Sequence, residues 1–159
     1  MSDECKILDP TAFGLFFVAI VSLPLAISGI GGSFDSSVSV ALGPLFMAAS
    51  FMIFIAAIAA YRAGSNFGFI VFGLVALGVF LSGVSGGTDQ YVNITLGIIY
   101  LVALIWSYRV GNPKTLTLIL LTTALIFLFL GIGGFADSAV CSQLLMGIAA
   151  LANFVLTLY

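Results

Sequence analysis

The chain alternates between long runs of apolar residues and short polar turns. Six apolar runs can be traced, over residues 11–31, 38–61, 67–86, 92–108, 115–133 and 139–158. Each run has about the 20 residues that a helix needs to cross the hydrocarbon core of a bilayer. In lipid, such a segment satisfies its backbone hydrogen bonds only as a helix. The pattern therefore predicts an all-α integral membrane protein, with six transmembrane helices in a single membrane domain over residues 1–159.

A glycine-rich turn recurs three times along the chain, over 27–35, 81–89 and 130–137. Each copy ends one apolar run and carries an aspartate just before the next run: Asp35, Asp89 and Asp137. A second repeat follows each aspartate inside the next run: Leu42-Gly43, Leu96-Gly97 and Met146-Gly147. These repeats predict three hairpins, roughly 11–61, 67–108 and 115–158, packed with approximate threefold symmetry around a central pathway. The alternative is that glycine, serine and aspartate simply make good turns.

The charges in the loops divide into two classes. The three glycine-rich turns carry aspartate and no basic residue, whereas the second loop carries Arg62 and the fourth carries Arg109 and Lys114. Basic residues favour the cytoplasmic side of a membrane. This distribution places both termini in the cytoplasm and the aspartates outside, in a multi-pass protein of the plasma membrane.

Composition restricts the class further. Apolar residues make up 62% of the chain and charged residues 6%, with a mean hydropathy of +1.32, against about 25% charged residues in a soluble domain. Four unclustered basic residues exclude a nucleic-acid-binding face. The chain has no histidine and two cysteines predicted on opposite sides of the membrane, so it lacks the usual zinc spacings and a credible catalytic base or nucleophile. We therefore expect no enzyme activity, no metal and no cofactor.

Polar groups within the apolar runs are hydroxyls and amides, and no ionisable acid or base lies in the middle of any run. They are Ser22, Ser28, Ser50, Ser82, Thr95, Ser107, Thr122, Thr123, Gln143 and Asn153. Such groups either hydrogen-bond between helices or line a path for a small polar solute. We select Ser50, Thr122, Thr123 and Asn153 as candidate pathway residues.

The entry to the first run reads Asp9-Pro10-Thr11-Ala12-Phe13-Gly14-Leu15. It resembles Asn-Pro-Ala-Pro-Leu-Gly-Leu, the signature of the acetate uptake transporter family, which includes the bacterial succinate–acetate permeases. Pro10, Gly14 and Leu15 match, and Asp9 replaces the asparagine.

A second stretch, Tyr61-Arg62-Ala63-Gly64-Ser65-Asn66-Phe67-Gly68, is similar to the family's Tyr-Lys-Lys-Gly-Asn-Thr-Phe-Gly. Here Tyr61, Gly64, Phe67 and Gly68 match. The resemblance extends over nearly the whole chain through its six runs and short loops.

The resemblance implies six-helix protomers that each contain a pore and assemble as a homohexamer. It implies passive or proton-linked movement of acetate and similar carboxylates. The family's two aromatic residues at the narrow part of the pore align with Val18 and Val75, and the third narrow-point residue falls near Thr123. Asp9 would lie at the cytoplasmic mouth, either as a cap of the first helix or as a pathway residue.

We therefore predict a membrane transporter or channel for acetate-like monocarboxylates. Its predicted partners are the lipid bilayer, a small carboxylate and protons. Two alternatives stay open. One is a channel for a neutral solute such as urea, an amide or ammonia. The other is an accessory membrane subunit without a pathway, which predicts a tightly packed, dry centre.

Overall fold

Six helices account for nearly all of the computed structural model, which describes residues 10–32, 36–84, 89–135 and 139–159. The helices are α1 (Pro10–Ile30), α2 (Ser36–Arg62), α3 (Asn66–Val84), α4 (Gln90–Val110), α5 (Lys114–Gly133) and α6 (Ala139–Leu158). No strand occurs in these described ranges. The predicted all-helical fold with six long apolar helices is confirmed, and the predicted bounds agree to within a few residues.

All six helices are long and apolar enough to cross a membrane. Their outward faces carry large apolar side chains, such as Phe16, Phe51 and Ile98, each more than half exposed. In water, a continuous surface of this kind would promote aggregation, whereas in a bilayer it faces hydrocarbon. The interior is therefore organised by packing and by hydrogen bonds between helices, rather than by separation of apolar from polar residues.

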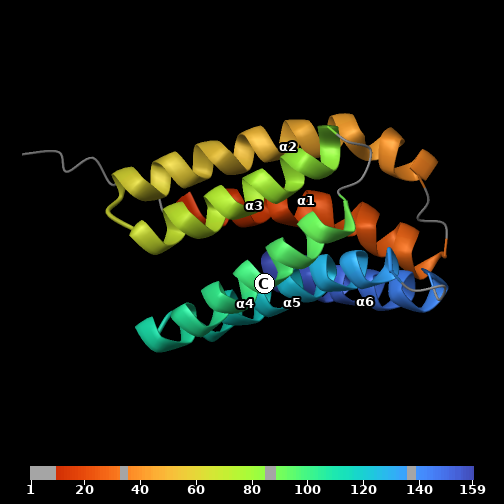
Figure 1. The fold of residues 1–159 in the computed structure, drawn as a ribbon. Coiled ribbons are helices and arrows are strands. Elements are labelled where there is room, and N and C mark those ends of the chain that lie inside the picture. The colour runs from red at the N-terminus through yellow and green to blue at the C-terminus, as the bar shows by residue number, and fades with distance from the viewer. Residues whose placement is uncertain (1–9, 33–35, 85–88, 136–138) are drawn as a thin grey trace, which may run out of the picture.

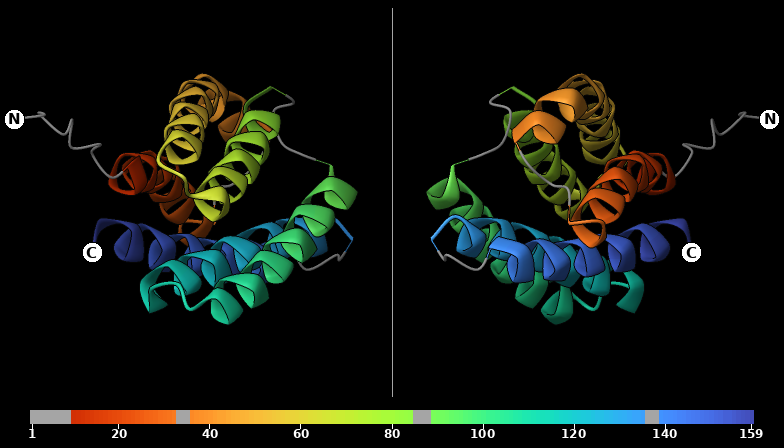
Figure 2. Two further views of the ribbon diagram at one scale, coloured as in Figure 1. Left: turned by 90° about the vertical axis from the view of Figure 1, so that its left-hand side faces the viewer. Right: turned by 90° about the vertical axis from the view of Figure 1, so that its right-hand side faces the viewer.

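The helices form two groups of three, α1–α3 and α4–α6, that face each other (Figures 1 and 2). The most extensive pairings are α2 with α3, α1 with α6 and α4 with α5. Each joins one predicted hairpin to the next, as a threefold arrangement requires. The hairpins themselves differ, because α1 packs on α2 and α5 on α6 while α3 and α4 make few contacts. The threefold arrangement therefore stays a prediction.

Glycines allow close approach at two of these pairings. An added Cβ at Gly147 of α6 would lie 2.8 Å from the carbonyl carbon of Gly29 in α1. An added Cβ at Gly43 of α2 would lie 2.8 Å from the carbonyl oxygen of Gly83 in α3. Small residues of this kind let helix backbones pack directly against each other in membranes.

The two loops with basic residues share one way of ending a helix. Gly64 has φ of 79° and Gly111 has φ of 76°, a left-handed conformation that favours glycine. The N–H of the residue after each glycine donates to a carbonyl five residues back, Ser65 to Ala60 and Asn112 to Ser107. This pattern is the Schellman motif, which satisfies carbonyls at the helix end.

The first stretch that resembles the family signature, which includes Pro10, Gly14 and Leu15, begins α1 and packs it against α3. Pro10 is the first residue of α1, where its missing N–H has no cost. Gly14 is buried under the Phe72 ring, which would lie 2.5 Å from an added Cβ. Leu15 packs against the core.

The second stretch that resembles the family, Tyr61 to Gly68, forms the connection from α2 to α3. Tyr61 is exposed at the end of α2, and its ring lies 5.3 Å from that of Phe69. Phe67 packs edge-on against Trp106 of α4, with ring centroids 5.1 Å apart. The Gly68 N–H donates to Ser65 Oγ at 3.1 Å, which satisfies a free donor in the first turn of α3.

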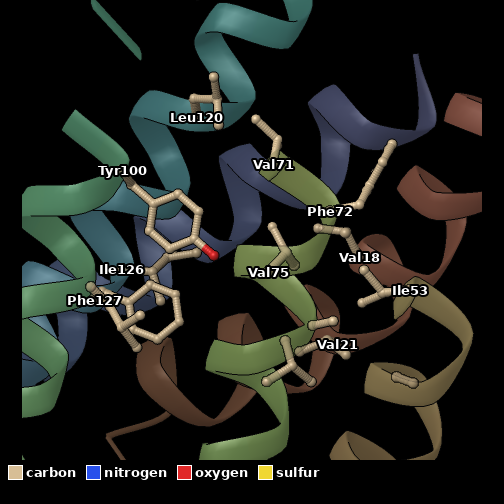
Figure 3. Packing of buried hydrophobic residues seen from close by; sticks show 14 of the residues in the cluster. Val18, Val21, Ile53, Val71, Phe72, Val75, Tyr100, Leu120, Ile126 and Phe127 are labelled. Atoms are coloured by element: carbon tan, nitrogen blue, oxygen red, sulfur yellow. The ribbon is translucent and has the colours of Figure 1, made fainter. Parts of the chain in front are cut away.

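The core lies where the two groups of helices meet, and Figure 3 shows its main side chains. Val18 and Val21 come from α1, Val75 from α3 and Tyr100 from α4. The Tyr100 ring stacks on Phe127 of α5, with centroids 5.5 Å apart and an interplanar angle of 12° (Figure 3). Val18, Val21, Val75 and Phe127 also line the cavity described next.

Candidate functional site

A cavity of about 260 Å³ lies among the helices and receives wall residues from all six. Most of the wall comes from α1, α5 and α6. Residues three, four or seven positions apart share one face of a helix. Val18, Val21, Ser22 and Leu25 of α1 have this spacing, as do Thr123, Ile126, Phe127 and Leu130 of α5.

The wall is mainly apolar and contains no charged residue among those described. Its polar side chains are Ser22, Ser82, Asn93, Thr123, Ser142, Gln143 and Asn153. Because a lone charge buried in such surroundings is very costly, the cavity suits a neutral solute.

Three of the wall hydroxyls direct their protons toward their own helices. Ser22 Oγ donates to the Val18 carbonyl at 2.8 Å, and Ser82 Oγ donates to the Gly78 carbonyl at 2.9 Å. Thr123 Oγ1 likewise donates to the Ile119 carbonyl at 2.8 Å. A hydroxyl has one proton, so each of these groups offers only lone pairs to any further partner.

Asn153 is the most deeply buried polar residue of the wall, with 1% of its surface exposed. Its Nδ2 donates to Thr123 Oγ1 at 2.7 Å, which joins α6 to α5. Its Oδ1 is buried and has no hydrogen-bond partner among the described residues. An acceptor left in that state costs free energy, so it marks a position where a donor is missing.

The structure brings together four of the seven predicted pathway residues: Val18, Val75, Thr123 and Asn153 line the cavity. Ser50 is instead buried in α2 beside a groove between α2 and α3, and its hydroxyl donates to the Met47 carbonyl. Thr122 is buried, but its hydroxyl donates to the Leu118 and Ile119 carbonyls of its own helix. Neither Ser50 nor Thr122 contributes to the cavity wall.

Asp9 lies outside the described residues, and so do Asp35 and Asp137 of the glycine-rich turns. Asp89 is exposed and caps α4, where its carboxylate accepts a hydrogen bond from the Tyr91 N–H at 3.0 Å. This aspartate is therefore the N-cap of α4.

Asn93 is a wall residue to which the sequence analysis gave no role, and Gln143 was named only among the polar groups. A signal for both exists in the sequence. Each lies four residues before a repeated glycine, Gly97 or Gly147, and therefore on the helix face that carries the close contact.

No group of three histidine, cysteine, aspartate or glutamate side chains gathers within the described part of the chain. The described wall of the cavity consists of hydroxyls, amides and apolar groups.

Comparison with solved structures gives one strong similarity. The bacterial acetate channel SatP superimposes with a TM-score of 0.73, covering 96% of this chain and 91% of that chain, at 17% sequence identity. This chain has the fold of that channel. No protein-family model matches the sequence, and a search of curated proteins finds no match. At this level of identity, the similarity to SatP establishes the membrane fold, and the solute must be argued from the cavity.

Proposed function

We propose that this protein is a membrane channel or transporter for acetate and similar small monocarboxylates, acting passively or linked to protons. The observation that carries the proposal is the uncharged cavity at the meeting point of all six helices. Its support is the fold shared with an acetate channel. Neither a carboxylate relay nor a fixed cation is available within the described wall, so the solute itself must be neutral or must acquire a proton.

Val18, Val75, Thr123 and Asn153 are the residues that we propose line the pathway, with Asp9 at its cytoplasmic mouth. We also propose a plasma-membrane location with both termini in the cytoplasm, from the basic loops that contain Arg62, Arg109 and Lys114. We also propose that the protein forms a homo-oligomer, a hexamer by the family resemblance.

A channel for a neutral solute such as urea or acetamide is the second candidate. The Asn153–Thr123 pair favours it, because an amide acceptor in an uncharged wall also suits an amide solute. The third alternative, an accessory subunit without a pathway, predicts a tightly packed centre. The cavity of about 260 Å³ does not favour that alternative.

The test is uptake of radiolabelled formate, acetate, succinate and urea by proteoliposomes at an acidic and a neutral pH. Empty vesicles, and vesicles that hold an unrelated membrane protein at equal mass, give the background. Acetate uptake above both controls, faster at acidic pH, is the expected result. Acetate uptake equal to both controls would overturn the proposal, and urea uptake that ignores pH, without acetate uptake, would select the second candidate.

A further inference from the structure

We propose that the Oδ1 atom of Asn153 is the solute-binding acceptor of the cavity, and that the cavity selects small neutral molecules that carry an O–H or N–H donor. Protonated short carboxylic acids and primary amides belong to this class, while carboxylate anions and ketones do not. This inference rests on the proposed function, because it concerns the same cavity.

The orientation of the Asn153 amide follows from the hydrogen bonds around it. Thr123 has one proton, and that proton goes to the Ile119 carbonyl at 2.8 Å. The oxygen of Thr123 must therefore accept in its 2.7 Å contact with Asn153, so the NH₂ group of the amide lies on that side. The carbonyl side of the amide is then the one without a partner among the described residues.

Three of the surrounding hydroxyls have no free proton either. Ser22 and Ser82, like Thr123, donate to carbonyls of their own helices. These three wall hydroxyls and Asn153 Oδ1 therefore present only lone pairs to a solute. A carboxylate anion also presents only lone pairs, so these four groups offer it no hydrogen bond, whereas a molecule with a donor satisfies the buried acceptor.

Competition on the wild-type protein tests donor selection without any substitution. Acetamide and acetone match acetic acid in their number of heavy atoms, but only acetamide carries a hydrogen-bond donor. In proteoliposomes at acidic pH, we expect acetamide to reduce the protein-dependent uptake of radiolabelled acetate about as strongly as unlabelled acetate does. Acetone at the same concentration should leave that uptake within about 1.5-fold of its value without competitor.

Substitution of Asn153 tests the residue. Asn153→Leu retains the approximate volume and removes both amide groups, and it should lower protein-dependent acetate uptake about tenfold. Thr157→Val is the matched control. Thr157 is buried in α6 one turn further on, lies outside the cavity wall, and donates only to the Asn153 and Phe154 carbonyls of its own helix. Its uptake should stay within about twofold of the wild type.

The outcomes separate the two proposals. Absence of protein-dependent acetate uptake in the wild type overturns the proposed function itself. If acetone reduces uptake as strongly as acetamide does, donor selection is overturned. Uptake by Asn153→Leu within about twofold of the wild type also overturns it. If Asn153→Leu does not elute as a folded protein in detergent, the wild-type competition decides alone.

Discussion

The close contact between α1 and α6 gives a sharp test of how the helices are held together. An alanine Cβ at Gly147 would lie 2.6 Å from the Ile30 backbone nitrogen and 2.8 Å from the Gly29 carbonyl carbon. Both neighbours are backbone atoms, so no side-chain rotation relieves the overlap. Opening the shorter contact from 2.6 Å to the 3.4 Å of ordinary van der Waals contact moves the helices about 0.8 Å apart at this point.

The cost follows from that displacement. A gap of about 0.5–1 Å forfeits a quarter to a half of the attraction between facing atoms, and overpacking costs about 1–3 kcal/mol. Replacing glycine by alanine inside a helix recovers at most about 1 kcal/mol. Because both contacts are with backbone atoms, we take the upper part of the overpacking range, about 2–3 kcal/mol. After the gain of about 1 kcal/mol, we expect Gly147→Ala to reduce the free energy of unfolding by about 1–2 kcal/mol.

Gly73 provides the matched control, because it also lies inside a helix, α3, and an added Cβ there meets no atom within 4 Å. Gly73→Ala should leave stability unchanged or raise it. The assay is thermal unfolding of the full chain in one detergent, followed by size-exclusion chromatography of the fraction that stays folded. A Gly147→Ala midpoint equal to that of Gly73→Ala would refute the reasoning.

Four further predictions concern the cavity and its surroundings. Val75→Phe enlarges a wall residue so that it fills part of the cavity, and it should lower acetate uptake at least about threefold, measured in proteoliposomes with folding checked by chromatography. Thr123→Val removes the acceptor for Asn153 Nδ2 and should cost about 1–2 kcal/mol in thermal unfolding, while Thr122→Val should cost less than about 0.5 kcal/mol; equal losses would contradict this. Tyr100→Phe removes a buried hydroxyl that has no partner among the described residues, and should leave the thermal midpoint unchanged or higher. Asp89→Ala removes the cap of α4 and should cost about 1 kcal/mol without changing uptake per folded protein, and a loss of uptake would assign this aspartate to the pathway.

The helices themselves were predictable, because their existence depends on properties local to the sequence. A run of about 20 apolar residues has one way to satisfy its backbone in lipid, so length and hydropathy suffice. The helix ends at Gly64 and Gly111 were equally local. Both loops have the sequence Tyr-Arg-X-Gly, Tyr61–Gly64 and Tyr108–Gly111, and the glycine accepts positive φ.

The candidate site was predictable only in part. Thr123 and Asn153 were found because polar groups in an apolar run need a partner or a path, and Val18 and Val75 were found through the family resemblance. Ser50 met the same criterion of polarity and yet lies outside the cavity wall. In a soluble helix, the polar face would have shown which side is buried, but here both faces are apolar.

What the sequence by itself determined is therefore the number, length and local ends of the helices, together with an interior that carries no charge in mid-span. What only the tertiary structure decided is which side of each helix faces the cavity, since rotation is fixed by packing at contacts such as Gly29 with Gly147. The unpartnered oxygen of Asn153 belongs to this second class. It depends on Thr123, thirty residues away, having already given its proton to Ile119, and no local rule connects those three residues.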